Sequence, residues 1–132
     1  MANGKETVNE LMNIVNKLHQ DRVQIANLDA QIARLEQTKQ LDNLNLKRIE
    51  AKHILVIENQ KQPDGQPLIC DVHVKRAMAE DMMVQDKTGM ALIQKMVLIS
   101  KHINRKKRTQ DILQADITAL ESKEKILILQ AT

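Results

Sequence analysis

The sequence predicts an all-α protein in which two long helices form an antiparallel coiled-coil hairpin around a central turn at about residues 59–73. Three observations support this fold class. Apolar residues recur every seven positions through the first part of the chain, which is typical of a coiled-coil seam. None of the 132 residues is Phe, Tyr or Trp, so the core must consist of aliphatic side chains and methionine, as interdigitating helices allow. A Pro-Asp-Gly sequence then marks a turn between two helical stretches.

The seven-residue repeat runs from Leu11 to Val56. Its first position falls on Leu11, Leu18, Ile25, Ile32, Lys39, Leu46 and His53, and its second on Ile14, Asp21, Leu28, Leu35, Asp42, Ile49 and Val56. Ten of these fourteen residues are Leu, Ile or Val. The polar ones either set the register of the pairing or mark drift of the stripe, because 3.6 residues per turn does not match a 3.5 repeat. We expect drift for Asp21 and Asp42 and leave Lys39 open.

The first helix is expected at about residues 6–58. Thr7 followed by Glu10 resembles a capping box, in which the two side chains bond to each other's backbone N–H groups. No Gly or Pro occurs between residue 5 and Lys52, so nothing in the sequence interrupts the helix.

The centre of the chain allows two structures. In the first, helix continues to about Gln60, an irregular loop containing Pro63-Asp64-Gly65 turns the chain, and another helix begins near Asp71. In the second, residues 53–58 and 68–74 pair as a short β-hairpin, because both segments are rich in β-branched residues. Two strands alone are marginally stable, so we favour the loop.

A second long helix is expected at about residues 75–130. One apolar stripe along it contains Met78, Met82, Leu92, Met96, Ile99, Ile103, Leu113, Ile117, Leu120 and Leu127, interrupted by Lys106, Gln110 and Glu124. Gly89 marks a bend, a close helix contact or a tolerated glycine, and we favour the last of these. Folding back buries both stripes at once, so we expect one elongated helical domain over residues 1–132.

Two segments carry more apolar residues than one helix partner can cover. Residues 90–99 read MALIQKMVLI, and residues 126–129 read ILIL. A helix that is apolar on nearly every side needs more than one neighbour, so we expect the chain to associate with itself. The candidate interface residues are Leu92, Met96, Ile99, Ile103, Ile126, Leu127 and Leu129.

The sequence offers little chemistry. It contains no glycine-rich phosphate loop, zinc-binding helix motif, calcium loop or nucleophile elbow. The single cysteine, Cys70, excludes an intramolecular disulfide and is expected to be an incidental reduced thiol. The four histidines, His19, His53, His73 and His102, have no metal-ligand spacing. We therefore expect no enzyme activity, no catalytic residue, no metal, no cofactor and no small-molecule substrate.

Positive charge is concentrated in residues 101–108, KHINRKKR, on a chain whose formal net charge is +3. Such a patch would support salt-sensitive, sequence-independent binding of nucleic acid. The candidate contacts are Lys101, Arg105, Lys106, Lys107 and Arg108. The alternative is a solvated face that pairs with acids of the first helix, of which Asp29 and Asp21 lie at about the right height in a hairpin.

Residues 46–52, LKRIEAK, resemble a stretch of the helical recombination mediator proteins of large tailed phages. That resemblance implies an oligomer that loads recombinase onto single-stranded DNA, although the basic element that follows in that family is replaced here by Glu58-Asn59-Gln60. Hairpin chaperones of the prefoldin type share the layout of helix, turn and helix.

The sequence thus predicts a self-assembling scaffold or adaptor protein. The alternatives are an oligomeric nucleic-acid accessory protein and a holdase-like chaperone that uses the apolar helix ends or the methionine-rich residues 78–96. No apolar run is long enough to span a bilayer, and residues 1–11 lack a secretory pattern. We therefore expect no membrane association and a cytoplasmic location, or host cytoplasm or virion if the protein is viral.

Overall fold

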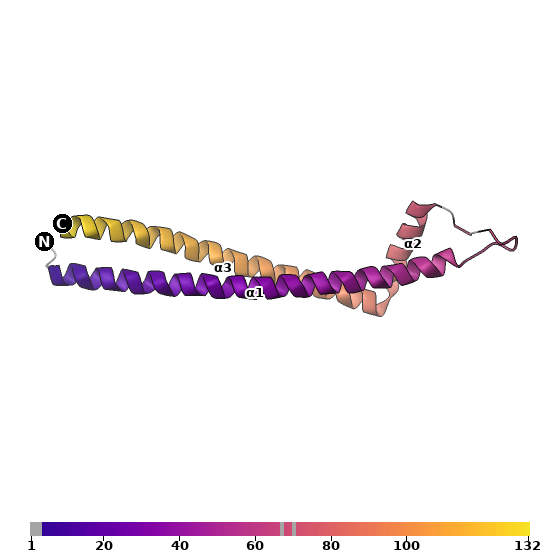
Figure 1. The fold of residues 1–132 in the computed structure, drawn as a ribbon, viewed down its shortest axis with the longest axis horizontal. Coiled ribbons are helices and arrows are strands. Elements are labelled where there is room, and N and C mark those ends of the chain that lie inside the picture. The colour runs from indigo at the N-terminus through magenta and orange to yellow at the C-terminus, as the bar shows by residue number, and fades with distance from the viewer. Residues whose placement is uncertain (1–3, 67, 70) are drawn as a thin grey trace. The chain divides into compact units, whose positions relative to one another are not determined.

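The computed structural model describes residues 4–66, 68–69 and 71–132 as an all-α protein (Figure 1). It contains α1 (Gly4–Glu58), α2 (Val72–Gln85) and α3 (Lys87–Ala131), and no strand forms among these residues. The start of α1 and the end of α3 lie side by side (Figure 1). The predicted fold class, two long helices packed together around a central turn, is confirmed.

The chain divides into two compact units. The first unit comprises Met1–Arg34 with His102–Thr132, and the second comprises Leu35–Lys101. In the first unit the helices are antiparallel, because Arg22 contacts Glu121 and Gln31 contacts Lys106. Its core contains the buried residues Ile14, Leu18, Ile117 and Leu127, with Leu11, Ile25 and Leu120 packed against them. Each fully buried aliphatic side chain of this kind contributes roughly 1.5–3 kcal/mol.

The predicted seam of α1 is the face that packs. Every repeat position from Leu11 to His53 is buried or half-buried, and the four polar positions are included. The expectation that Asp21 and Asp42 leave the seam through drift is therefore wrong. Drift occurs at the end of α1 instead, where Val56 is 51% exposed and Ile57 is 1% exposed. On an ideal α-helix, each heptad position is rotated by about 20° relative to the same position one heptad earlier. After five or six heptads the accumulated rotation equals about one residue, so Ile57 rather than Val56 occupies the buried face.

Between α1 and α2 the chain forms an irregular loop with a tight turn. Gly65 has a φ of 86°, which a residue with a side chain rarely adopts, and the side chain of Asp64 accepts a hydrogen bond from Gln66 N. The backbone N–H of Leu68 donates to the carbonyl of Gln60. The loop interpretation is correct and the alternative β-hairpin is wrong, since residues 53–58 belong to α1 and 72–74 to α2.

The second predicted helix is divided at Asp86. The Asp86 N–H donates to Met82 and Met83 carbonyls at the end of α2, and its carboxylate accepts from Thr88 N and Gly89 N at the start of α3. A Cβ at position 89 would lie 2.6 Å from the Met83 carbonyl oxygen. Gly89 therefore marks a close contact between α2 and α3, and the interpretation as a tolerated glycine is wrong.

The second unit has its own core from all three helices. Ile57 of α1, Ala79 and Met83 of α2, and Ile99 of α3 are buried there. The start of α2 is fixed by Asp71, whose carboxylate accepts hydrogen bonds from His73 N and Val74 N. This N-cap supplies acceptors for backbone donors that have no partner within the helix.

Candidate functional site: exposed surfaces and polar seam residues

The predicted interface residues fall into two groups. Ile99 in the second unit and Ile103 and Leu127 in the first are buried. Leu92 and Met96 of the second unit are half-buried. These five lie on the predicted apolar stripe of α3, and much of their surface is already covered within the chain. Ile126 and Leu129 are 55% and 75% exposed, so they remain available to a second molecule.

The predicted basic residues of the first unit lie on the surface of α3. Arg105, Lys107 and Arg108 are exposed, and Lys106 is half-buried with its Nζ 2.6 Å from Oε1 of Gln31. In the second unit Lys101 is exposed as well. Lys106 therefore contacts a neutral amide of α1.

The two acids proposed as partners of the basic residues have other contacts. Asp29 accepts a hydrogen bond from Nε2 of Gln110, at 2.5 Å. Asp21 lies in the seam, with its Oδ1 3.1 Å from Nζ of Lys17 on the same helix. Both acids are therefore contacted by side chains other than the predicted basic ones.

Asp21 and Asp116 form a carboxyl pair across the seam of the first unit. Asp21 has no exposed surface, while Asp116 is half-buried on α3. Their shared hydrogen bond raises the pKa of Asp116, and burial and the nearby charge of Asp21 raise it further. The same hydrogen bond, with help from Lys17, lowers the pKa of Asp21. As the pH falls, Asp116 therefore binds a proton at a higher pH than an isolated aspartate does, while Asp21 stays ionised.

The second unit contains two further polar contacts. Nζ of Lys95 lies 3.2 Å from Oδ1 and 3.1 Å from Oδ2 of Asp42, whose side chain is 7% exposed. Nε2 of His53 lies 3.2 Å from Oδ2 of Asp86. The backbone N–H groups of Gly89 and Thr88 lower the pKa of Asp86, and His53 adds a smaller effect in the same direction. These contacts explain why Asp42 and His53 occupy seam positions.

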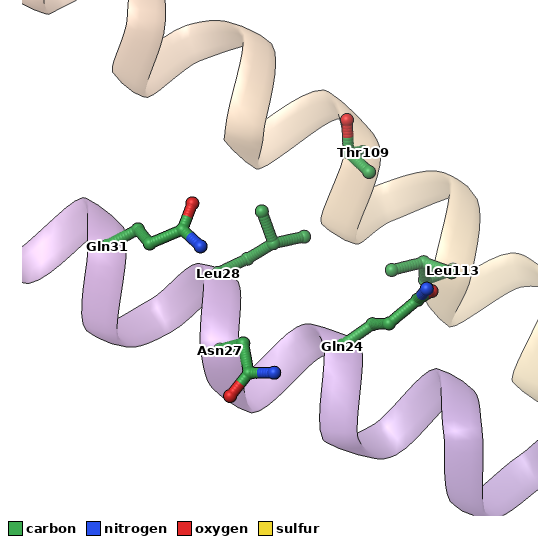
Figure 2. A pocket seen from close by; sticks show the side chains of 6 residues that line it. All are labelled: Gln24, Asn27, Leu28, Gln31, Thr109 and Leu113. Atoms are coloured by element: carbon green, nitrogen blue, oxygen red, sulfur yellow. The ribbon is translucent and has the colours of Figure 1, made fainter.

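A groove of about 300 Å³ lies between α1 and α3 in the first unit (Figure 2). Figure 2 shows Leu28 pointing from α1 toward α3, from which Thr109 and Leu113 come. The other lining residues are Gln24, Asn27 and Gln31. None of the six side chains titrates near neutral pH, so the groove offers hydrogen bonds and apolar contact but no acid or base for catalysis.

An apolar hollow of about 410 Å³ lies along α3 in the second unit. Its lining residues are Met90, Ile93, Gln94, Val97 and Leu98. All of them come from within residues 90–99, which the sequence singled out as apolar on nearly every side. One amide among four apolar side chains suits an apolar partner.

Three exposed apolar residues of the first unit were not predicted from the sequence. Val8, Met12 and Val15 of α1 are 53–59% exposed, and Ile128 of α3, within the predicted segment 126–129, is 47% exposed. The signal was present in α1, where residues 8, 12 and 15 follow helical spacing directly beside the seam residues Leu11, Ile14 and Leu18.

No family model matches the chain, and no curated protein or solved structure matches it significantly. The fold therefore defines a class, an all-α helical hairpin, and the functional argument depends on the residues described above.

Two further observations concern membranes and metals. Within the described part of the chain, no helix is both long and apolar enough to cross a membrane. Among the same residues, no three His, Cys, Asp or Glu side chains gather as metal ligands would. Cys70 lies outside the described residues.

Proposed function

We propose that this chain is a non-enzymatic scaffold or adaptor protein that associates with copies of itself through apolar surface outside its helical seam. The observation that carries the proposal is the amount of such surface. In the first unit, Val8, Met12, Val15 and Ile128 are exposed, and in the second, Met90, Val97 and Leu98 are exposed. Contiguous exposed apolar residues commonly mark interaction sites.

The total accessible surface supports the same proposal. The chain exposes 9848 Å², whereas a compact monomer of its mass, 15.1 kDa, exposes about 7,100 Å². The difference exceeds the roughly 800 Å² that each partner buries in a standard protein interface. Self-association can therefore cover a full interface and still leave surface for another partner, as a scaffold or adaptor requires.

Light scattering coupled to size exclusion tests this proposal. We expect a discrete species heavier than one chain that persists at high salt, because burial of apolar surface does not weaken as ions screen charges. A monodisperse monomer over the micromolar range would contradict it. An oligomer that dissociates at high salt would show that charged side chains, and not apolar surface, hold the copies together.

A second candidate function is binding of nucleic acid through residues 101–108. It is favoured by the exposure of Lys101, Arg105, Lys107 and Arg108 and by the engagement of Asp29 and Asp21 with other side chains. A single-stranded DNA contact of this kind loses affinity with a log–log salt slope of about −0.7 for each phosphate neutralised.

Fluorescence anisotropy of labelled single-stranded and duplex oligonucleotides tests the second candidate. The variant carries Gln at the four exposed basic positions, and the matched control carries Gln at Lys5, Lys87, Lys123 and Lys125, which are equally numerous and also exposed. Binding that is lost in the variant and kept in the control would support the candidate. Equal loss of binding in the variant and the control would show that binding depends on the net charge of the chain and not on residues 101–108.

A further inference from the structure

One side of the helix pair in the first unit is marked by an ion pair. Arg22 of α1 lies 3.2 Å from Glu121 of α3, so these two positions flank the seam on the same side. Moving one heptad toward the ends of the helices leads to Val15 on α1 and Ile128 on α3. Because seven residues return to nearly the same face of a helix, Val15 and Ile128 flank the seam on that side as well.

Val8 and Met12 extend this surface along α1. Residues spaced by four and then three lie on one helix face, so the side chains at 8, 12 and 15 form a single row. We call Val8, Met12, Val15 and Ile128 the apolar flank. All four are about half exposed although they are aliphatic.

The opposite side of the same helices is polar. At matching heights it carries Glu10 and Lys17 on α1 and Lys123 and Gln130 on α3, all exposed. Among the positions that directly flank the seam, the exposed apolar side chains at this height therefore lie on one side. Ile126 and Leu129 of α3 are exposed as well, but they do not occupy seam-flanking positions.

The pattern on α1 is that of a helix with two neighbours. A helix that packs against one partner needs apolar residues at two positions of the heptad, whereas a helix in a bundle core needs a third, adjacent position. Leu11, Ile14 and Leu18 supply the first two positions, and Val8 and Val15 supply the third. Among the described residues of the first unit, α3 is the one helix that packs beside this part of α1.

We propose that the apolar flank binds the apolar flank of a second copy of this chain, so that two helix pairs form a four-helix contact. This inference rests on the proposed self-association and names the surface that mediates it. The flank is complementary to itself because apolar contact requires no matching of donor and acceptor. A two-fold axis brings identical surfaces together.

The charges beside the flank and the available area both favour a second copy as the occupant. The ion pair that borders the flank is closed within one chain, so Arg22 and Glu121 do not demand an oppositely charged partner. The accessible surface in excess of a compact monomer is larger than a standard dimer removes from each subunit.

Charge substitutions at Val15 test the contact directly. Val15→Glu and Val15→Lys each place a charge in the flank, and each is expected to weaken association by at least about tenfold. If flank meets flank, an equimolar mixture of the two variants brings opposite charges together and recovers the wild-type mass. Analytical ultracentrifugation gives the masses, and circular dichroism shows whether each variant keeps its helix content.

The control substitutes exposed apolar residues elsewhere in the first unit, with Val23→Gln and Ile112→Gln combined in one variant. It is expected to keep the wild-type mass. Should a charge variant lose helix content, Val15→Gln provides the same comparison without a charge. Helical Val15 variants that keep the wild-type mass would overturn the flank contact while leaving self-association in place.

Two other outcomes are also decisive. Dissociation of both charge variants without recovery in the mixture would show that the flank meets a different surface, and would overturn the symmetric contact. A wild-type protein that is monomeric would instead overturn the proposed function on which the inference rests.

Discussion

The carboxyl groups of Asp21 on α1 and Asp116 on α3 interact across the seam of the first unit, which raises the pKa of Asp116 and lowers that of Asp21. Two neighbouring carboxyl groups interact favourably when one is protonated and the other is ionised. Because Asp21 has no exposed surface, its charge depends on Lys17 and Asp116 for stabilisation. The relationship makes the stability of this unit depend on pH.

Asp116→Asn should therefore stabilise the protein at neutral pH. A raised pKa in the folded state means that Asp116 contributes stability fully below its unfolded pKa and loses it as the pH rises through the folded value. Asparagine cannot ionise, and its amide donates to Asp21 at every pH. We expect the Tm of the variant to exceed that of the wild type by a few degrees at pH 7 and by less near pH 4. A difference that does not change with pH would contradict the shared proton.

Asp86 should show the opposite pH dependence. Its pKa is lowered chiefly by the backbone N–H groups of Gly89 and Thr88, so its contribution is present above the unfolded pKa and is lost as the pH falls through the folded value. Asp86→Asn keeps a capping oxygen but not the charge. We expect the variant to have a lower Tm than the wild type at pH 7, with the two values converging below pH 4. Thermal scans followed by circular dichroism measure both Tm values at each pH. A difference in Tm that stays constant across the pH range would show that the ionised Asp86 carboxylate is not what stabilises the wild type.

The contact between Asp42 and Lys95 should behave as a pair. Lys95→Met leaves a nearly buried carboxylate without its cation, and we expect a loss of about 1–3 kcal/mol, at the lower end because Lys95 is half exposed. Asp42→Leu in the same chain removes the stranded charge and should restore most of the stability. Urea unfolding of the two single variants and the double variant gives the coupling energy. A coupling energy near zero would mean that the contact contributes nothing.

Gly89→Ala should destabilise the junction of α2 and α3. An alanine Cβ would lie 2.6 Å from the Met83 carbonyl oxygen, so the two helix ends must separate. We expect a loss of about 1–3 kcal/mol in urea unfolding, although Gly→Ala inside a helix ordinarily gains up to about 1 kcal/mol. Gly4→Ala is the matched control, because nothing lies within 4 Å of its added Cβ. Equal effects at both positions would rule out a steric cause at Gly89.

Several features of the fold could be predicted because their causes are local or periodic. The stripe from Leu11 to His53 is recognisable from spacing alone, and it is the face that packs. The turn at Pro63-Asp64-Gly65 depends on residues whose backbone preferences act within a few positions. The end of α1 at Glu58 follows from these signals.

The exposed surfaces were predicted only in part. Ile126 and Leu129 were named from composition and are exposed, whereas Val8, Met12 and Val15 were missed. Their row lies beside the seam and becomes recognisable once the Arg22–Glu121 contact shows which side of α1 flanks α3. A single helix pattern does not contain that information.

The sequence by itself determined that this protein is all-α and which stripe of the first helix packs, because those properties follow from the periodicity of apolar residues. Only the tertiary structure decided that Asp21 and Asp42 are buried, since an aspartate stays in a seam when another side chain, such as Asp116 or Lys95, compensates its charge there. Only the tertiary structure placed the break at Asp86, because it requires Gly89 to approach the Met83 carbonyl oxygen more closely than any side chain allows.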